Sequence, residues 1–346
     1  MKENILQIDR EALLKDLYSH NGAKEIQGLL NIKTPSEWFE TTKNTPTPQM
    51  LFGEFWFEGE LCILFADTNL GKSILAVQIA DSISKGKAIE GLKLEAKAQP
   101  VVYFDFEMAA KQFELRYSIQ TEDNKTCKNH YGFDDNFKRV ELNPDADMPT
   151  DISFEDFLNE SIEQCIIETG AKVIIIDNIT FLRTENEKAR DALPLMKELK
   201  ALKSKHNLSI LVLAHTPKRD LSKPISRNDL QGSKMLINFV DSCFAIGESH
   251  TDKRLRYLKQ IKARNTEIVY DTENVLNSQI QKLSNFLEFE FSGIGNERIH
   301  LKQYSEKDRQ NLIVKSKELS SNGYSQREIA RELSIAVGTV NKYLKL

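Results

Sequence analysis

With 346 residues, the chain is long enough for one large hydrophobic core and a smaller second module. It is 40% hydrophobic and 28% charged, with a formal net charge of −4, which is the composition of a water-soluble globular protein. No apolar run approaches the length of a bilayer, which excludes a membrane-spanning protein, and the overall acidity argues against a protein that coats nucleic acid.

The compartment can be predicted from the start of the chain and from its cysteines. The opening stretch, MKENILQIDREALL, contains no apolar secretory segment. The four cysteines are scattered and form no Cys-x-x-Cys pair; they are Cys62, Cys127, Cys165 and Cys243. This pattern predicts a cytoplasmic protein with no disulfide framework and no cysteine zinc site.

Charge is distributed unevenly along the chain. Residues 305–346 contain eight Lys and Arg against five Asp and Glu, a net charge of +3, so the rest of the chain carries −7. A basic tail on an acidic body indicates two parts with separate tasks.

Changes of composition divide the sequence into segments. In chain order, we expect a helical leader and linker (1–50), a main domain (51–293), a second linker (294–304) and a small helical module (305–346). In the leader, Thr34 is the predicted cap of a helix that begins at Pro35. Within the main domain, residues 120–152 are rich in Asn, Asp and Lys and are expected to form a surface insertion.

Apolar, β-rich runs alternate with helical patterns from residue 60 to about residue 292. The runs are ELCILFAD, PVVYFDFE, AKVIIIDN, LSILVLAH, DSCFAIG, RLRYLKQIKA and NFLEFEFSG. Continuous apolar strands separated by helices predict a mostly parallel sheet with helices on both faces. The expected fold class is therefore α/β, with a small all-α module at the C-terminus.

A phosphate-binding pattern follows the first of these runs. The stretch LFADTNLGKSILAVQIA places A-D-T-N-L-G-K-S between a strand that ends at Phe65 and a helix that begins near Lys72. This is the context of a P-loop, whose backbone N–H groups surround the phosphates of ATP. The predicted nucleotide-binding residues are Ala66, Asp67, Thr68, Asn69, Leu70, Gly71, Lys72, Ser73 and Ile74.

Individual side chains of this loop have separate expected roles. Lys72 is predicted to reach the β- and γ-phosphates, and Ser73 to bind Mg²⁺ through its hydroxyl. Ala66 stands where the pattern usually has its first glycine, and alanine can serve there if its φ stays negative. Asn69 tolerates the left-handed region better than most residues.

Three polar residues end other predicted strands, where the side chains of a parallel sheet converge on a ligand. Asp177 ends KVIIID and is the candidate Mg²⁺ carboxylate, with a cap of the next loop as the alternative. Glu107, in VVYFDFEM, is a candidate for polarising the attacking water, or else a first-turn helix acid. His215 ends SILVLAH and is the candidate γ-phosphate sensor.

The order of these motifs resembles the RecA-like hexameric ATPases, which include the DnaB-type replicative helicases and the RepA-type plasmid helicases. YFDFEMAAKQFELR resembles the segment that carries the family's catalytic glutamate, and NDLQGSKMLINFVDSCFAI resembles the segment before a core strand. LKQIKARN resembles the family's Lys-x-Arg-Asn at a late strand end. The resemblance, greatest to compact AAA-domain ATPases of bacterial mobile elements, implies a RecA-like P-loop core.

The same resemblance assigns Lys262 and Arg264 to a site shared between subunits. In the family, the corresponding Lys and Arg reach the γ-phosphate in a neighbouring subunit. The implied assembly is a homo-oligomer, expected to be a hexamer, in which each site needs two copies. A solvated strand end is the alternative interpretation of these two residues.

A basic loop without an apolar period follows His215. The cations of TPKRDLSKPISRNDLQG are Lys218, Arg219, Lys223 and Arg227. In RecA-like rings the corresponding loop lines a central channel, so the resemblance implies contacts with the phosphates of single-stranded DNA. The alternative is an ordinary solvated loop.

The tail GYSQREIARELSIAVGTVNKYL has the pattern helix, tight turn, helix. Ser325 is the predicted cap of the first helix, with Glu328 completing a capping box. The predicted apolar face consists of Ile329, Ala330, Leu333, Val337, Val340 and Leu344. The pattern resembles the helix-turn-helix tails of resolvase-like and LuxR-like proteins, which implies that helix 337–344 binds duplex DNA. The candidate contacts are Thr339, Asn341 and Lys342; a helical hairpin for partner contacts is the alternative.

Together, these patterns predict a Mg²⁺-dependent, ATP-hydrolysing and DNA-binding protein. The first interpretation is a RepA-type helicase or a replication or mobilisation ATPase of a mobile element. The alternative is a DNA-binding regulator that is switched by ATP and neither translocates nor unwinds DNA.

Overall fold

The computed structural model describes residues 31–121, 126–182, 192–217, 219–230, 233–303, 306–333, 335 and 337–346. The chain divides into two compact units, one ending at Thr47 and one beginning at Pro48. In the first unit, α2 (Pro35–Thr42) is capped by Thr34, whose side chain accepts a hydrogen bond from the N–H of Glu37. This confirms the predicted helix start.

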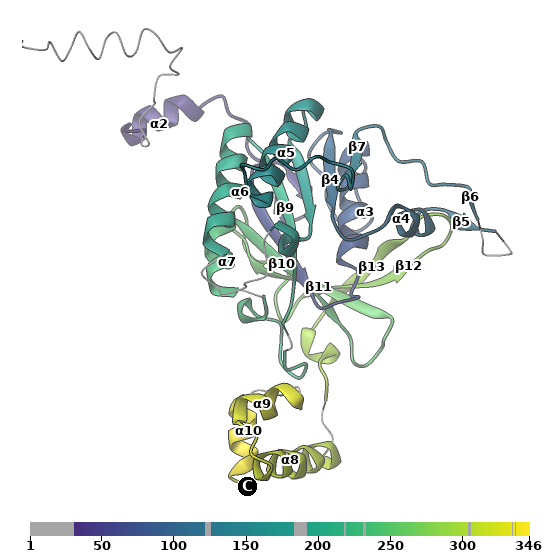
Figure 1. The fold of residues 1–346 in the computed structure, drawn as a ribbon, viewed down its shortest axis with the longest axis vertical. Helices are drawn as coiled ribbons and strands as arrows, with labels where there is room; N and C mark the ends of the chain where they lie inside the picture. The colour runs from purple at the N-terminus through teal and green to yellow at the C-terminus, as the bar shows by residue number, and fades with distance from the viewer. Residues whose placement is uncertain are drawn as a thin grey trace, which may run out of the picture. The chain divides into compact units, whose positions relative to one another are not determined.

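A sheet of nine strands forms the centre of the second unit, in the order β13-β12-β11-β10-β3-β9-β8-β4-β7 (Figure 1). All neighbours from β10 to β7 are parallel, whereas β11, β12 and β13 pair antiparallel. The strands are β3 (Leu61–Ala66), β4 (Val101–Asp105), β7 (Phe137–Val140), β8 (Val173–Asp177), β9 (Ser209–His215), β10 (Ser242–Glu248), β11 (Leu255–Lys262), β12 (Val275–Gln281) and β13 (Glu288–Gly295). The predicted mostly parallel α/β sheet is confirmed.

Helices and short strands complete the second unit. The α-helices are α3 (Lys72–Lys85), α4 (Ala110–Arg116), α5 (Phe154–Thr169), α6 (Ala192–His206), α7 (Ser233–Phe239), α8 (Glu306–Ser321), α9 (Gln326–Glu332) and α10 (Val337–Leu344). The 3-10 helices are η1 (Ile179–Leu182), η2 (Arg227–Asp229) and η3 (Glu297–His300). The short strands are β1 (Met50–Phe52), β2 (Trp56–Phe57), β5 (Ile119–Gln120) and β6 (Cys127–Lys128).

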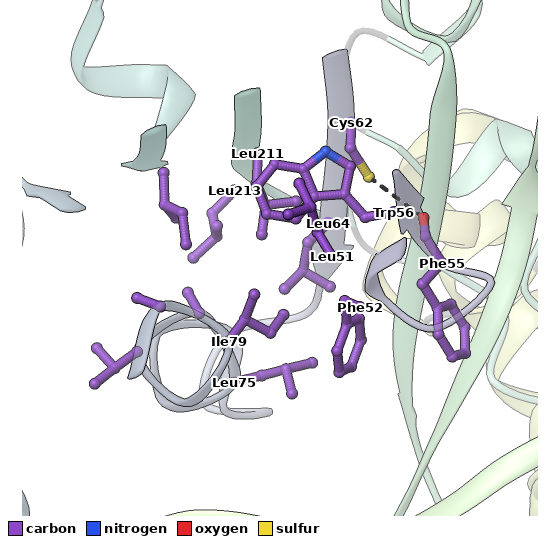
Figure 2. Packing of buried hydrophobic residues seen from close by; sticks show 14 of the residues in the cluster. Leu51, Phe52, Phe55, Trp56, Cys62, Leu64, Leu75, Ile79, Leu211 and Leu213 are labelled. Atoms are coloured by element: carbon purple, nitrogen blue, oxygen red, sulfur yellow. Dashed lines mark hydrogen bonds between the residues drawn. The ribbon is translucent and has the colours of Figure 1, made fainter. Parts of the chain in front are cut away.

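Helices cover both faces of the central sheet, because side chains alternate along each strand. On β3, residues 61, 63 and 65 join the core on one face, and residues 62, 64 and 66 join the core on the other. The first core includes residues of α5, α6 and α7, and the second includes those of α3. Figure 2 shows part of the second core, where Leu75 and Ile79 of α3 pack with Phe52 of β1 and Leu64 of β3.

The segment 120–152, expected as a surface insertion, contributes β7 to the edge of the sheet. Residues 137–140 pair in parallel with residues 101–104 of β4. The sequence FKRV gives little sign of this, because an edge strand buries few of its side chains; only Phe137 of the four is fully buried. The strand β12, VLNSQIQ, was not predicted either; it lies between β11 and β13, and its polar residues interrupt the apolar run by which the other strands were predicted.

The C-terminal module has three helices, α8, α9 and α10, around its own small core. The buried residues are Ile313, Ile329, Ala330, Ile335, Val340 and Tyr343. Ser325 accepts a hydrogen bond from the N–H of Glu328, which confirms the predicted capping box. Val337, expected in the core, is instead 43% exposed, because Ile335 in the turn and Tyr343 occupy that space. Among the described helices, none is long and apolar enough to cross a membrane.

Candidate functional site

The loop between β3 and α3 has the backbone conformation of a phosphate cradle. Ala66 is the last residue of β3, paired with His215 of β9 and Ile246 of β10, so it is extended and needs no glycine. Asn69 and Gly71 have positive φ values of 64° and 95°. A Cβ on Gly71 would lie 2.7 Å from Cδ1 of Ile280, so this position also needs glycine for space.

Lys72 is the first residue of α3 and its side chain turns back into the loop. Its Nζ donates hydrogen bonds to the carbonyl oxygens of Ala66 (3.0 Å) and Asp67 (3.1 Å). Burial lowers the pKa of Lys72, and the nearby carboxylates of Asp177 and Glu107 act in the opposite direction. The ammonium is therefore held within the loop by its backbone carbonyl groups.

Asp177 ends β8 beside the start of α3, with an exposed fraction of 1%. Its Oδ2 accepts a hydrogen bond of 2.7 Å from the hydroxyl of Tyr103, and Ser73 forms a hydrogen bond with the same carboxylate. Burial raises the pKa of Asp177. One hydroxyl and one carboxylate are the hard oxygen donors that suit Mg²⁺, which keeps water and phosphate as its other ligands. The predicted pair Ser73 and Asp177 is thus brought together and fits this ion.

Glu107 and His215, from the turn after β4 and the end of β9, meet beside Lys72. Nζ of Lys72 lies 3.3 Å from Nδ1 of His215, and Nε2 of His215 lies 3.7 Å from Oε1 of Glu107. Because an ammonium only donates, Nδ1 accepts and the ring proton is on Nε2, facing Glu107. The interaction with His215 lowers the pKa of Glu107, with burial opposing it and Lys72 adding to it. Glu107 is thus kept ionised, as a base for water must be.

Asn178 is a site residue that the sequence analysis missed. Its Nδ2 donates a hydrogen bond to Oε1 of Glu107 and lies 3.1 Å from Nε2 of His215. The side chain therefore donates to Glu107 and lies beside His215, whose Nε2 carries the ring proton and accepts nothing from the amide. Its only signal in the sequence is that it directly follows Asp177 in IIIDN.

A second missed contact supports the turn that carries Glu107. Asp105, buried at the end of β4, accepts hydrogen bonds from the N–H of Met108 (2.9 Å) and from Nε of Arg139 (2.8 Å). Arg139, which comes from β7, also donates to the carbonyl oxygen of Met108 at 2.5 Å. Asp105 and Arg139 thus hold the 105–108 turn by hydrogen bonds at both ends and so fix the direction of Glu107.

Lys262 and Arg264 lie at the end of the sheet opposite the P-loop. Lys262 pairs with Cys243 at the start of β10, whereas Ile246 of β10 is level with Ala66. Three residues of strand separate the two levels by roughly 10 Å, and Arg264 lies two residues beyond. Arg264 is half exposed and forms an ion pair with Asp241. The structure therefore does not bring these two residues to the P-loop of their own chain.

The predicted DNA-contacting residues lie in two places. In the loop after β9, Arg219 donates to the carbonyl oxygen of Lys223 (3.0 Å), Lys223 pairs with Asp220 (3.5 Å), and Arg227 is exposed in η2. Lys218 lies outside the described residues. On α10, Asn341 and Lys342 are exposed and Thr339 is half-buried.

Comparison with known proteins gives one family. Residues 30–220 match AAA_25, an AAA domain. A similar solved structure is a KaiC-like protein from the hyperthermophilic archaeon Pyrococcus horikoshii OT3, 16% identical, with a TM-score of 0.43 over 68% of this chain and 91% of that one. No curated protein matches the chain. Because the AAA_25 match covers more than half of the chain and includes the P-loop, Glu107, Asp177 and His215, the chain belongs to this AAA domain family and is a P-loop ATPase.

Proposed function

We propose that this ATPase acts on DNA as a homo-oligomer, expected to be a hexamer, with ATP bound between neighbouring copies. The observation that carries the proposal is the distance along the sheet between the P-loop and Arg264. A guanidinium at that end is out of reach of its own γ-phosphate, but a second copy can present it to that phosphate. A head-to-tail contact of this kind forms a ring when its rotation closes, as the proposed hexamer requires.

The chemistry proposed for this site is the transfer of the γ-phosphoryl group of ATP to water. Glu107 takes a proton from the attacking water, and Asn178 and His215 hold its carboxylate in direction. Lys72 and the neighbour's Arg264 stabilise the charge on the transferred group. Mg²⁺, held by Ser73 and Asp177, would neutralise charge on the phosphate oxygens.

The proposed DNA contacts are of two kinds. The C-terminal module has the three-helix arrangement and the exposed Asn341 and Lys342 on α10 that duplex recognition would use. The loop after β9, with Lys218, Arg219, Lys223 and Arg227, would contact single-stranded DNA in a central channel. A RepA-type helicase, or a replication ATPase of a mobile element, would combine both kinds of contact.

Mixing two inactive variants tests the shared site. Lys72→Ala removes the P-loop cation and Arg264→Ala removes the neighbour's guanidinium, so each variant alone should hydrolyse ATP at least tenfold more slowly. In an equal mixture, about a quarter of the sites combine an intact P-loop with an intact Arg264, and about a quarter of the wild-type rate should return. Arg254→Ala is the matched control, because Arg254 is an exposed arginine that also pairs with an aspartate.

The mixture contradicts the shared site if its rate stays at the level of the separate variants. Full activity of Arg264→Ala alone would contradict it as well. The DNA part is tested separately, by the ATPase rate with and without single-stranded DNA and by unwinding of a tailed duplex. Stimulation together with unwinding supports the helicase, whereas an unstimulated rate contradicts it.

One observation favours a second function, an ATP-switched DNA-binding regulator. Arg219 and Lys223 both form contacts within their own loop, which leaves them less available to a DNA strand in a channel. A regulator would bind duplex DNA through α10 alone. Slow turnover that DNA does not change, with sequence-specific duplex binding that ATP alters, would support this second function over the helicase.

A further inference from the structure

We infer that Asp241 is a positioning residue of the shared site, which holds Arg264 in the place where a neighbour's phosphates would meet it. The inference rests on the proposed function, because it assigns a task to a residue that no phosphate touches. Asp241 directly precedes β10, and its side chain is 14% exposed, whereas that of Arg264 is 52% exposed.

The two carboxylate oxygens of Asp241 have different partners. Oδ2 accepts hydrogen bonds from the N–H of Leu61 (3.0 Å) and from Nζ of Lys203 (2.9 Å). Oδ1 accepts from Nη1 of Arg264 (3.1 Å). One oxygen is therefore fixed to the body of the domain, and the other fixes the direction of the guanidinium.

Neighbouring contacts hold the rest of the segment that carries Arg264. Nζ of Lys262 donates to the carbonyl oxygen of Ile237 at 2.7 Å, and Nδ2 of Asn265 donates to Oε1 of Glu60 at 3.0 Å. The guanidinium of Arg264 pairs with the carboxylate of Asp241. The side chains of Lys262 and Asn265 thus anchor the segment on both sides of Arg264, and the Asp241 contact gives the guanidinium its direction.

The charge around Asp241 supports the same task. Burial acts to raise the pKa of Asp241, but the N–H of Leu61 and the cations Lys203 and Arg264 hold it below its usual value. Asp241 is therefore ionised at neutral pH. Lys203 and Arg264 contact this carboxylate and Lys262 lies near it, so these three cations outnumber the two carboxylates of Asp241 and Glu60, and the excess positive charge favours the approach of a triphosphate.

Asp241 also connects the two half-sites of one subunit. Leu61, whose N–H it accepts, is the first residue of β3, and Ala66 at the other end of β3 begins the P-loop. Five residues of strand span roughly 17 Å. One buried strand thus joins the P-loop of a subunit to the residue that directs Arg264 toward the next subunit, which is a short physical route for coupling between sites.

Mixing experiments test whether Asp241→Asn damages the P-loop half of the shared site or the half that supplies Arg264. The variant should lower kcat about tenfold to a hundredfold, since a misplaced guanidinium loses its contact in the transition state. Mixed in equal amounts with Lys72→Ala, which has an intact Asp241 and Arg264, it should regain about a quarter of the wild-type rate. Mixed with Arg264→Ala, it should regain nothing, because both variants lack a working guanidinium.

Two further measurements separate positioning from structure. In the Arg264→Ala background, Asp241→Asn should cause no additional loss of kcat, because it acts through Arg264. Asp252→Asn is the matched control, since Asp252 also pairs with an exposed arginine, and it should leave kcat unchanged. If Asp241→Asn does not fold, Asp241→Glu keeps the charge, displaces the carboxylate and should give the same complementation pattern.

The outcomes distinguish the inference from the proposed function. If Lys72→Ala and Arg264→Ala do not restore each other, the shared site itself is wrong, and the inference falls with it. If they do restore each other but Asp241→Asn is rescued equally by both variants, or by neither, only the inference is wrong. Additive losses of kcat in the double variant would also overturn it.

Discussion

Tyr103 donates a hydrogen bond of 2.7 Å from its hydroxyl to Oδ2 of Asp177, across neighbouring strands of the sheet. Both side chains are almost completely buried. Burial and the negative charge of Asp177 raise the pKa of Tyr103 well above its usual value, so the phenol stays a donor. The carboxylate proposed to hold Mg²⁺ is therefore oriented by a residue inside the core.

Tyr103→Phe is expected to lower both stability and Mg²⁺ affinity. Removing the hydroxyl leaves a buried carboxylate oxygen without its donor, at a cost of about 1–3 kcal/mol. The thermal midpoint should fall, and the Mg²⁺ concentration for half-maximal ATPase should rise several-fold. Tyr324→Phe, a change of the same kind at a half-exposed tyrosine, is the control. An unchanged Mg²⁺ dependence would contradict an orienting role for Tyr103.

Asp177→Asn is expected to stabilise the protein without nucleotide while abolishing hydrolysis. Because burial raises the pKa of Asp177 above its usual 3.8, the folded state binds protons more readily than the unfolded state. The contribution of Asp177 to the free energy of unfolding therefore decreases as the pH rises from the usual pKa through the raised one. At neutral pH the buried, ionised carboxylate destabilises the folded state. Asparagine removes that charge, and a rise in Tm of about 2–4 °C is expected by calorimetry. A lower Tm would show that the carboxylate stabilises the fold.

Glu107 determines the acid limb of the pH–rate profile in the proposed mechanism. The contact with His215 lowers the pKa of Glu107 below its usual 4.5, so the carboxylate remains ionised until the pH falls below that value. His215→Ala should shift the acid limb of kcat to higher pH, and Glu107→Gln should reduce kcat by about 10²–10⁴-fold while ATP still binds. If the acid limb of kcat stays at the wild-type pH in His215→Ala, His215 does not set the pKa of the group that controls this limb.

Ala66 and Gly71 should respond oppositely to exchange of alanine and glycine. Ala66→Gly restores the usual loop pattern but loosens the end of a strand, so it should cost about 0.5–1 kcal/mol and give no faster hydrolysis. Gly71→Ala forces a Cβ into a residue with φ of 95° and to within 2.9 Å of the Phe289 ring, so it should weaken ATP binding severely. Equilibrium unfolding and a nucleotide-binding titration measure both. Faster hydrolysis by Ala66→Gly would mean that the loop of this chain is impaired.

Gln78 closes the outer edge of the sheet in the way a further strand would. Its amide donates to the carbonyl oxygen of Phe289 (3.0 Å) and accepts from the N–H of Phe289 (2.9 Å), on the edge strand β13. Gln78→Leu leaves both backbone groups unpaired and should lower the free energy of unfolding by about 2–4 kcal/mol. Light scattering on heating should also show earlier aggregation, because the edge is exposed. Unchanged unfolding and scattering would contradict this role.

The sequence predicts the parts of the fold that are buried on both sides. The strands that end at Ala66, Asp177 and His215 are continuous apolar runs, and a parallel sheet brings their ends together whatever the loops do. The residues at those ends were therefore predictable from position alone. The matching structural observation is that Lys72, Asp177, Glu107 and His215 lie within one cluster of contacts.

The supporting contacts were not predictable in the same way. Asn178, Arg139 and Tyr103 act through particular hydrogen bonds to residues on other strands, and no spacing along the chain encodes such a partner. The strand β7 was missed because its sequence is half polar, as an edge permits. Val337 was placed in the core by its period, but Ile335, in the turn between two helices, took its place.

The edge strand β7 has a consequence for shortened versions of this chain. Residues 120–152 contain none of the motifs by which the ATPase is recognised, so a minimal version would naturally omit them. That deletion would remove Arg139 and leave Asp105 as a buried carboxylate without its cation, next to the turn that presents Glu107. Such a protein would keep the P-loop and the strand-end residues and lose the contacts of Arg139 that support the turn of Glu107, the proposed base. The segments that carry the ATPase motifs are therefore not sufficient for the proposed site, because residues 120–152 supply the cation of Asp105.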